Sequence, residues 1–285
     1  MEPIVMMRAC PDSDPSFDRA TRRWAGAMLA LWLFALAAAP QLLASAGLNL
    51  DLHGHAQQTD HGHPFADART MWGIPNAMDV LSNLPLVAAG LWGLLLARTR
   101  RLPPEVAFAC RLFLTGLILS GAGSAVYHWT PDAETLLWDR LGMAVAFAGA
   151  LGLVVTERAR QAAWPSLASV CVVAAVSAAL PLWTGNVGPW AVVQYGGVVF
   201  IAWAATHPAG PNAIGVRWAA LLGWYALAKV LELFDAPVFE ATGGVVAGHA
   251  LKHIAAALAA GPVILALRRQ RLRQNVPVSG AERGV

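Results

Sequence analysis

The chain alternates between long apolar runs and short polar connections. A membrane-spanning helix needs about 20 mostly apolar residues. Eight runs approach or reach that length, at residues 24–47, 76–97, 106–128, 135–156, 163–183, 187–206, 216–234 and 244–267. The runs are continuous and rich in Ala and Leu, whereas a transmembrane β-strand would alternate apolar and polar residues over about ten positions. The pattern therefore predicts an all-α integral membrane protein.

Composition agrees with this prediction and excludes other classes. Of the 285 residues, 57% are hydrophobic and 13% are charged, whereas a soluble domain carries about 25% charged residues. The net charge is only +3, and the basic residues lie in short clusters between apolar runs, so nothing indicates nucleic-acid binding. The three cysteines are odd in number and have no short spacing, which favours packing roles over a disulfide framework or a thiolate metal site.

Most arginines lie on one side of the predicted membrane. Fifteen of them fall in the tails and connections that share a side with both termini: Arg8, Arg19, Arg22, Arg23, Arg98, Arg100, Arg101, Arg158, Arg160, Arg217, Arg268, Arg269, Arg271, Arg273 and Arg283. The connections on the opposite side contain only Arg69. Because positively charged loops stay in the cytoplasm, both termini are predicted to be cytoplasmic. The alanine-rich spans and short loops favour a bacterial inner membrane.

The predicted architecture is a seven-transmembrane-helix bundle with one additional N-terminal transmembrane helix. Its parts are a cytoplasmic N-terminal tail at 1–23, the extra helix at 24–47, a His-rich outer loop at 48–71, the bundle at 72–268 and a cytoplasmic C-terminal tail at 269–285. Two alternatives stay open. The first span can be a signal peptide cleaved near Ala44-Ser45-Ala46. The loop, with its His-Gly-His repeats, can capture metal or be a solvated linker.

Polar residues gather in the outer half of the predicted spans. Ionisable side chains inside a membrane are costly and mark either a functional site or a paired internal contact. With the orientation above, five spans place such residues at a similar depth: Asp79, Ser82, Asn83, Ser124, His128, Asp139, Lys229, Glu232, His249 and His253. The shared depth predicts that they meet in one site.

Three histidines in this set predict a metal centre. His249 and His253 are four residues apart, so both imidazoles project from one helix face, and His128 can supply a third nitrogen. Three protein nitrogens and one open position are the arrangement of a catalytic zinc ion. A His pair on a helix can instead form hydrogen bonds that hold neighbouring helices together. The third histidine and the common depth favour the metal, and Zn²⁺ is the expected cofactor.

The neighbouring polar residues have candidate roles. Asp139 can orient a metal ligand or take a proton from metal-bound water. Ser124 lies one turn from His128 and can donate a hydrogen bond to an oxyanion. Lys229 and Glu232 are expected to form a buried ion pair, with a direct substrate contact as the alternative. Residues 82–83, a Ser-Asn pair, either bond neighbouring helices or orient a ligand.

These motifs together resemble the alkaline ceramidase family. The resemblance covers about residues 72–268 and rests on Ser124-Ala-Val-Tyr-His128, Asp139 eleven residues later and Gly248-His249-Ala-Leu-Lys-His253. Ser82-Asn83 and Lys229-Val-Leu-Glu232-Leu-Phe-Asp235 fit the same pattern. The family belongs to the CREST superfamily of seven-helix membrane hydrolases, which also includes the adiponectin-receptor-like proteins.

The resemblance implies a zinc-dependent hydrolase of linear C–N amide bonds that acts on a sphingolipid or a similar lipid. His128, His249 and His253 would bind zinc, Asp139 would help to activate water, and Ser124 would assist the oxyanion. The segment Met71-Trp72-Gly73-Ile74-Pro75-Asn76 lacks the run of carboxylates with which eukaryotic ceramidases bind calcium. Calcium regulation therefore does not carry over, and neither does the identity of the substrate.

Three functions are compatible with these residues. The first is a lipid amidase whose substrate enters from the bilayer. The second is a receptor-like or structural membrane protein in which the metal only ties helices together; a fourth protein ligand would favour it. The third is a transporter that relays ions through Asp139, Lys229 and Glu232, although the inverted repeats of many transporters do not stand out. The sequence predicts no oligomeric state.

Overall fold

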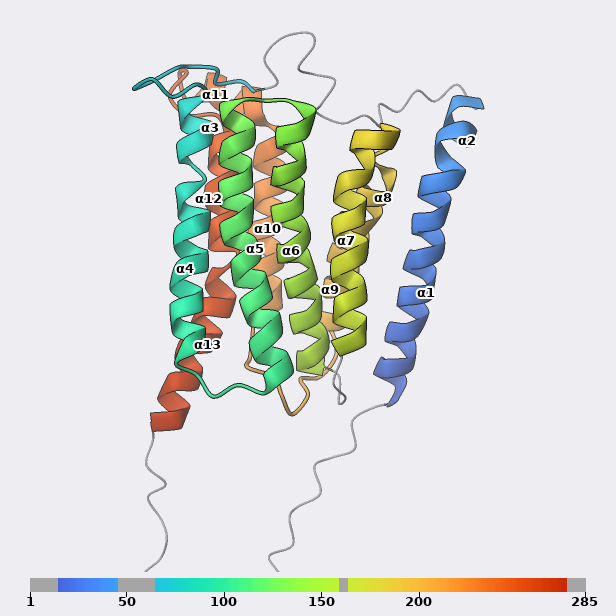
Figure 1. Ribbon diagram of the computed structural model, residues 1–285. Helices are drawn as coiled ribbons and strands as arrows, with labels where there is room; N and C mark the ends of the chain where they lie inside the picture. The colour runs from blue at the N-terminus through green and yellow to red at the C-terminus, as the bar shows by residue number, and fades with distance from the viewer. Residues whose placement is uncertain (1–14, 46–64, 159–163, 276–285) are drawn as a thin grey trace, which may run out of the picture.

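The computed structural model describes residues 15–45, 65–158 and 164–275. The described residues form helices that run side by side, with loops at the two ends of the bundle (Figure 1). The helical elements are α1 Pro15–Ala37, α2 Ala39–Ser45, α3 Ala77–Leu81, α4 Leu84–Arg98, α5 Pro104–Trp129, α6 Ala133–Arg158, α7 Trp164–Thr184, α8 Gly188–Ala191, η2 Val192–Gly196, α9 Gly197–Ala205, α10 Trp218–Leu233, α11 Asp235–Ala241, α12 Gly248–Leu258 and α13 Gly261–Asn275. Most of the His-rich loop, with all four of its histidines, lies outside the described residues.

Every predicted apolar run coincides with one helix or with consecutive helices. The main differences are at the ends: α1 begins at Pro15, well before the predicted residue 24, and α13 continues to Asn275. Five helical segments are long and apolar enough to cross a membrane: Ala77–Arg98, Pro104–Trp129, Ala133–Arg158, Gly188–Ala205 and Gly248–Gln270. The protein is therefore all-helical in the described residues and compatible with an integral membrane protein, while the count of seven or eight spans stays a prediction.

Prolines explain where α3, α10 and α12 end. The helices α3, α10 and α12 end at Leu81, Leu233 and Leu258. Each of these residues lies four positions before a proline, namely Pro85, Pro237 and Pro262. A proline has no backbone N–H to offer the carbonyl four residues earlier, and its ring clashes with that carbonyl. The predicted spans 76–97 and 244–267 run across two of these breaks, whereas the predicted span 216–234 ends within one residue of the end of α10.

Glycines bring α5 and α6 into close contact. On each helix two glycines lie seven residues apart, Gly116 and Gly123 on α5 and Gly142 and Gly149 on α6. A Cβ atom on any of them would lie 2.2–2.3 Å from a backbone atom of the other helix. Small residues at such positions allow backbones to approach closely, as is usual between membrane helices.

A buried carboxylate at the lower end of α6 in Figure 1 anchors the connection between α9 and α10. Glu157 is fully buried, and its Oε1 accepts hydrogen bonds from the backbone N–H groups of Ile214, Gly215 and Val216 at 2.9–3.1 Å. Its Oε2 accepts a bond from the indole of Trp218 at 2.7 Å. Gly215 has φ +84°, and this left-handed conformation lets successive N–H groups converge on one anion. The bonds fix the start of α10.

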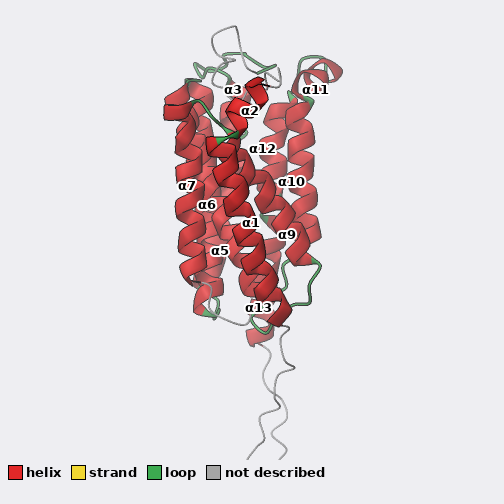
Figure 2. Cartoon of the chain, turned by 90° about the vertical axis from the view of Figure 1, so that its right-hand side faces the viewer, coloured by secondary structure: helices red, strands yellow, loops and turns green. Residues whose placement is uncertain are grey.

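Helix α1 runs along the side of the bundle (Figure 2). It packs against α8 and η2. The Phe17 ring stacks on Trp203 with a centroid distance of 5.4 Å. The indole N–H of Trp32 donates to Ser177 Oγ at 2.7 Å, and the Asn186 amide donates to the Ala35 carbonyl at 2.8 Å. These contacts make α1 an integral part of the folded bundle.

The glycine contact predicts a steric effect on stability. In Gly149→Ala the new methyl group would lie 2.2 Å from the Phe113 backbone nitrogen, so α5 and α6 must separate. We expect the free energy of unfolding in detergent micelles to fall by about 1–3 kcal/mol. The matched control is Gly223→Ala on α10, where nothing lies within 4 Å of the added carbon. Equal stability of the two variants would contradict the close-packing argument.

Candidate metal centre

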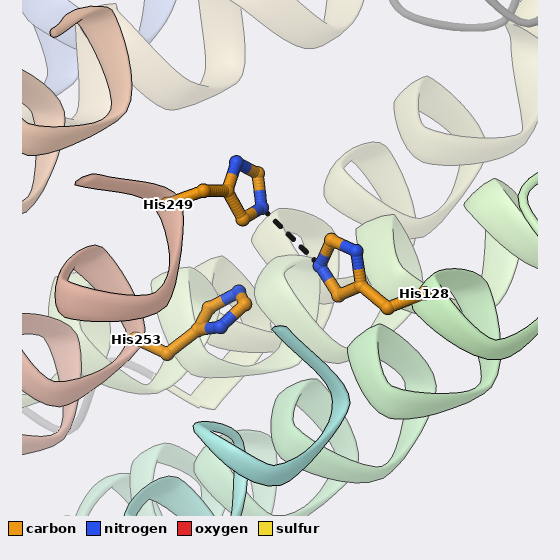
Figure 3. Close-up of side chains that lie close together, drawn as sticks. All are labelled: His128, His249 and His253. Atoms are coloured by element: carbon orange, nitrogen blue, oxygen red, sulfur yellow. Dashed lines mark hydrogen bonds between the residues drawn. The ribbon is translucent and has the colours of Figure 1, made fainter. Parts of the chain in front are cut away.

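Three buried histidines meet near the upper end of the bundle in Figure 1. His128 comes from the last turn of α5, and His249 and His253 come from successive turns of α12. One ring nitrogen from each lies within 4.8 Å of the other two. Figure 3 shows the three rings converging from these two helices. The cluster could hold a metal ion.

Two of the ring nitrogens have the spacing that a tetrahedral ion requires. The Nε2 atoms of His128 and His249 lie 3.2 Å apart (Figure 3). Two nitrogens at 2.0–2.1 Å from a tetrahedral zinc ion are about 3.3 Å apart. No other His, Cys, Asp or Glu of the described residues joins the cluster. Three neutral imidazoles can therefore hold the ion, and one position is left for a further ligand.

Asp235 fixes the start of the helix that carries two of the ligands. Its Oδ1 accepts a hydrogen bond from the His249 backbone N–H at 2.7 Å, and its Oδ2 accepts one from the Ala66 N–H at 3.0 Å. The first N–H groups of a helix have no partner within the helix, and a carboxylate there is favourable. Gly248 leaves no room for a side chain, because a Cβ would lie 2.3 Å from the Leu231 carbonyl oxygen. The sequence reading assigned no role to Asp235.

Ser82 orients the ring of His253. The Ser82 hydroxyl lies 2.8 Å from His253 Nδ1 and 3.0 Å from the Asp79 carbonyl oxygen. If the hydroxyl donates to the carbonyl, it accepts from Nδ1–H, and His253 Nε2 keeps its lone pair for a metal. Asn83 instead donates to the same Asp79 carbonyl at 2.8 Å. Ser82 therefore contacts a ligand residue, while Asn83 bonds across the break between α3 and α4.

Ser124 and Asp139 lie beside the cluster. Ser124 Oγ is 3.3 Å from His253 Nε2. The Asp139 carboxylate on α6 lies close enough to Ser124 to interact with its hydroxyl. Both residues line the cavity described below. The glycine contact between α5 and α6 produces this pairing, because Gly123 packs against the backbone of residues 138–139.

Two lysines share the carboxylate of Glu232. Glu232 accepts a hydrogen bond from Lys252 at 2.9 Å and another from Lys229. Glu232 and Lys229 are three residues apart on α10, whereas Lys252 lies on α12 next to His253. The ion pair expected from the sequence thus has a third member that links two helices.

The histidines open onto a mostly apolar cavity of about 360 Å³. Its wall includes Phe113, Phe147 and Leu221, and it reaches Ala256 and Ala259. The last two residues follow His249 by seven and ten positions, which corresponds to roughly 10–15 Å along a helix. A cavity of this volume lies in the range of small-molecule sites. It can take part of an acyl chain below the histidines.

The ring of Phe65 packs against two of the three histidines. Its ring centroid lies 4.5 Å from that of His128 and 4.9 Å from that of His249, and the side chain is buried. The sequence assigns this residue to the His-rich outer loop and predicts no role for it, because a lone aromatic residue in an irregular loop has no periodic signal. Two residues later, Asp67 accepts hydrogen bonds from the Arg69 guanidinium at 2.6 and 2.7 Å. Arg69 also donates to the Val245 carbonyl at 2.9 Å, which ties this segment to the loop before α12.

Metal analysis tests the histidine cluster. We expect about one zinc ion per chain in detergent-purified wild-type protein, because three imidazoles and an open position suit that ion. The double variant His249→Ala/His253→Ala removes two of the three ligands and should lose the metal while it stays folded. His207→Ala, which removes a histidine outside the cluster, is the matched control. Retention of zinc by the folded double variant would contradict the assignment.

The ion pair between Asp67 and Arg69 is predicted to be sensitive to acid. Hydrogen bonds from Arg69 hold the pKa of Asp67 below its usual range, so the ionised carboxylate stabilises the folded state. This contribution is complete above the ordinary carboxyl pKa of about 3.9 and is lost as the pH falls through the lower folded-state pKa. Asp67→Asn should therefore lower the melting temperature at pH 7, and the difference from wild type should shrink towards pH 3. A difference that does not depend on pH would exclude this ion pair as its cause.

Neither a scan of models of known protein families nor a search of curated proteins found a match for this chain. Its function therefore has to be inferred from the three histidines and the side chains around them.

Proposed function

We propose that this chain is a zinc-dependent membrane hydrolase that cleaves the amide bond of a lipid with water. The observation that carries the proposal is the buried His128–His249–His253 cluster at the top of an apolar cavity. A carboxylate and a hydroxyl, from Asp139 and Ser124, line the same cavity. This combination matches what amide hydrolysis needs: a metal site, a proton acceptor and a hydrogen-bond donor.

Zinc bound by three imidazoles supplies Lewis-acid chemistry, which lowers the pKa of bound water and polarises a carbonyl oxygen. Asp139 accepts a proton from the attacking water and holds it. Ser124 donates a hydrogen bond to the carbonyl oxygen while negative charge develops there. The water oxygen joins the carbonyl carbon, the C–N bond breaks, and the proton on Asp139 passes to the leaving nitrogen. The products are a fatty acid and an amine.

The cavity favours a lipid as the substrate. Its wall below the histidines is apolar, so an acyl chain can lie there while the amide faces the histidines. Five segments long and apolar enough to span a membrane surround or adjoin the cavity. We propose that the substrate enters from the bilayer.

The resemblance to alkaline ceramidases leads to the same reaction class. The matching motif residues His128, His249, His253, Ser124 and Asp139 lie together in space. We therefore propose that this chain is a ceramidase-like lipid amidase of a bacterial inner membrane. Both termini would be cytoplasmic and the site would lie in the outer half, since the arginine-rich connections lie at the end of the bundle where α1 begins and α13 ends.

A purely structural metal site is the main alternative. It would favour a fourth protein ligand, whereas the described residues supply three histidines. The half-buried Asp139 lining the cavity is a further argument for catalysis. A relay of ions through Lys229 and Glu232 is less well supported, because these residues are already paired with each other and with Lys252.

Hydrolysis assays on purified protein test the proposal. A panel of long-chain lipid amides that includes ceramide should contain at least one substrate for the zinc-loaded protein. Asp139→Asn removes the proton acceptor and should lower kcat by about 10²- to 10⁴-fold while zinc stays bound. Asp132→Asn, which changes a carboxylate outside the cavity, should keep full activity. Unchanged hydrolysis in His249→Ala would refute the proposal.

A further inference from the structure

Arg140 is a buried cation whose charge the proposed reaction does not use. It lies on α6 with 8% of its surface exposed, and it lines the cavity. Its guanidinium makes no hydrogen bond and no ion pair with any described residue. The neighbouring Asp139 interacts with it only at a distance, and that carboxylate lies next to Ser124 instead.

Burying a guanidinium that has no hydrogen bond or ion pair is energetically unfavourable. It carries five N–H donors in a rigid fork, and a charge that is largely removed from water without a partner costs more free energy than one that is paired. The fork matches the two oxygens of a carboxylate or a phosphate. A ligand with such a group would satisfy Arg140, whereas a neutral ligand would leave most of its donors without an acceptor.

Tyr127 supplies a second donor near the same place. Its hydroxyl is buried and has no hydrogen-bond partner among the described residues. The residue lines the cavity and lies within electrostatic range of Arg140. Its ring packs against His128 with a centroid distance of 5.2 Å. A group bound between Tyr127 and Arg140 would therefore lie beside the histidine cluster.

The two lysines that line the cavity are already paired, so Arg140 is left to bind an anionic group. Lys229 and Lys252 both bond to Glu232. The described lining residues comprise three cations, Arg140 and the two lysines, and two carboxylates, Asp139 and Glu232. The cavity thus has an excess positive charge even before a metal ion is added, and this excess favours an anionic ligand.

We propose that Arg140 and Tyr127 form a binding site for an anionic oxygen group on the amine half of the lipid amide. This inference rests on the proposed amidase function and specifies its substrate class: lipid amides such as N-acylated amino acids, in which a carboxylate or phosphate lies a few bonds from the amide nitrogen. Neutral amides such as ceramide bind less tightly at this site. The two donors position the substrate, and they take no part in bond cleavage.

A matched pair of substrates tests the subsite. N-palmitoylglycine and N-palmitoylethanolamine have the same acyl chain and amide, but only the first carries a carboxylate. The wild-type protein should prefer the anionic amide in kcat/KM. Arg140→Gln should lower the ratio of the two kcat/KM values by about 10- to 100-fold, as expected when a hydrogen-bonded charge pair is lost. Tyr127→Phe should lower the ratio by a smaller factor, and Arg140→Lys should restore part of the preference.

The control variant is Arg111→Gln, which removes the same charge from an exposed position on α5 outside the cavity. It should leave both rates unchanged. An equal preference in wild type and Arg140→Gln would overturn the proposal. Free palmitate has the same carboxylate chemistry and serves as a third ligand. If Arg140→Gln weakened palmitate binding alone, the site would belong to the fatty-acid product, and the proposal would again be wrong.

Direct binding separates this inference from the amidase function. If no lipid amide is hydrolysed, the amidase proposal fails, but titration of N-palmitoylglycine into purified protein still reports on the subsite. Tighter binding of the anionic than of the neutral amide, lost in Arg140→Gln and kept in Arg111→Gln, would support anion recognition by itself. Equal binding of the two amides to wild-type protein would contradict it.

Discussion

The close approach of α5 and α6 is the constraint on which the rest of the bundle depends. Four glycines remove the side chains that would hold the two backbones apart. Dispersion contacts between close-packed backbones are individually small but numerous, and in a bilayer they replace the hydrophobic effect as the main attraction between helices. The same approach places Ser124 of one helix beside Asp139 of the other. The contact between α5 and α6 therefore determines both the packing of these helices and the position of Ser124 relative to Asp139.

A second group of interactions positions α12 against this pair. Asp235 accepts the His249 N–H, Ser82 bonds the ring of His253, and Gly248 allows α12 to touch α10. His249 and His253 are thereby each held by a neighbour from a different part of the chain. A hydrogen bond to the ring of a ligand, such as the one between Ser82 and His253, orients the imidazole and sets its tautomer. These interactions give the cluster a fixed geometry without any charged residue among the ligands.

The sequence predicted the regular parts of the structure well and the irregular parts poorly. Apolar runs located the helices because span length is set by the bilayer, and the four-residue spacing of His249 and His253 put both on one face. The helix breaks before Pro85 and Pro262 were readable in principle but were masked by continuous hydropathy. Phe65 had no local signal, because its contact with the histidines joins segments far apart in the chain. Zinc, the substrate and the number of spans stay predictions.

The carboxylate of Glu157 has a consequence for the order in which the protein assembles. Its partners, the N–H groups of residues 214–216, lie almost 60 positions later in the chain and at the end of the bundle predicted to face the cytoplasm. Water can solvate these N–H groups until they reach Glu157 at the end of α6. Once the bonds form, the start of α10 is held at a fixed height relative to α6. Glu157 thus sets the height of Lys229 and Glu232 in the bundle by fixing the opposite end of their helix. Because Glu157 comes earlier in the chain, it is synthesised before α10.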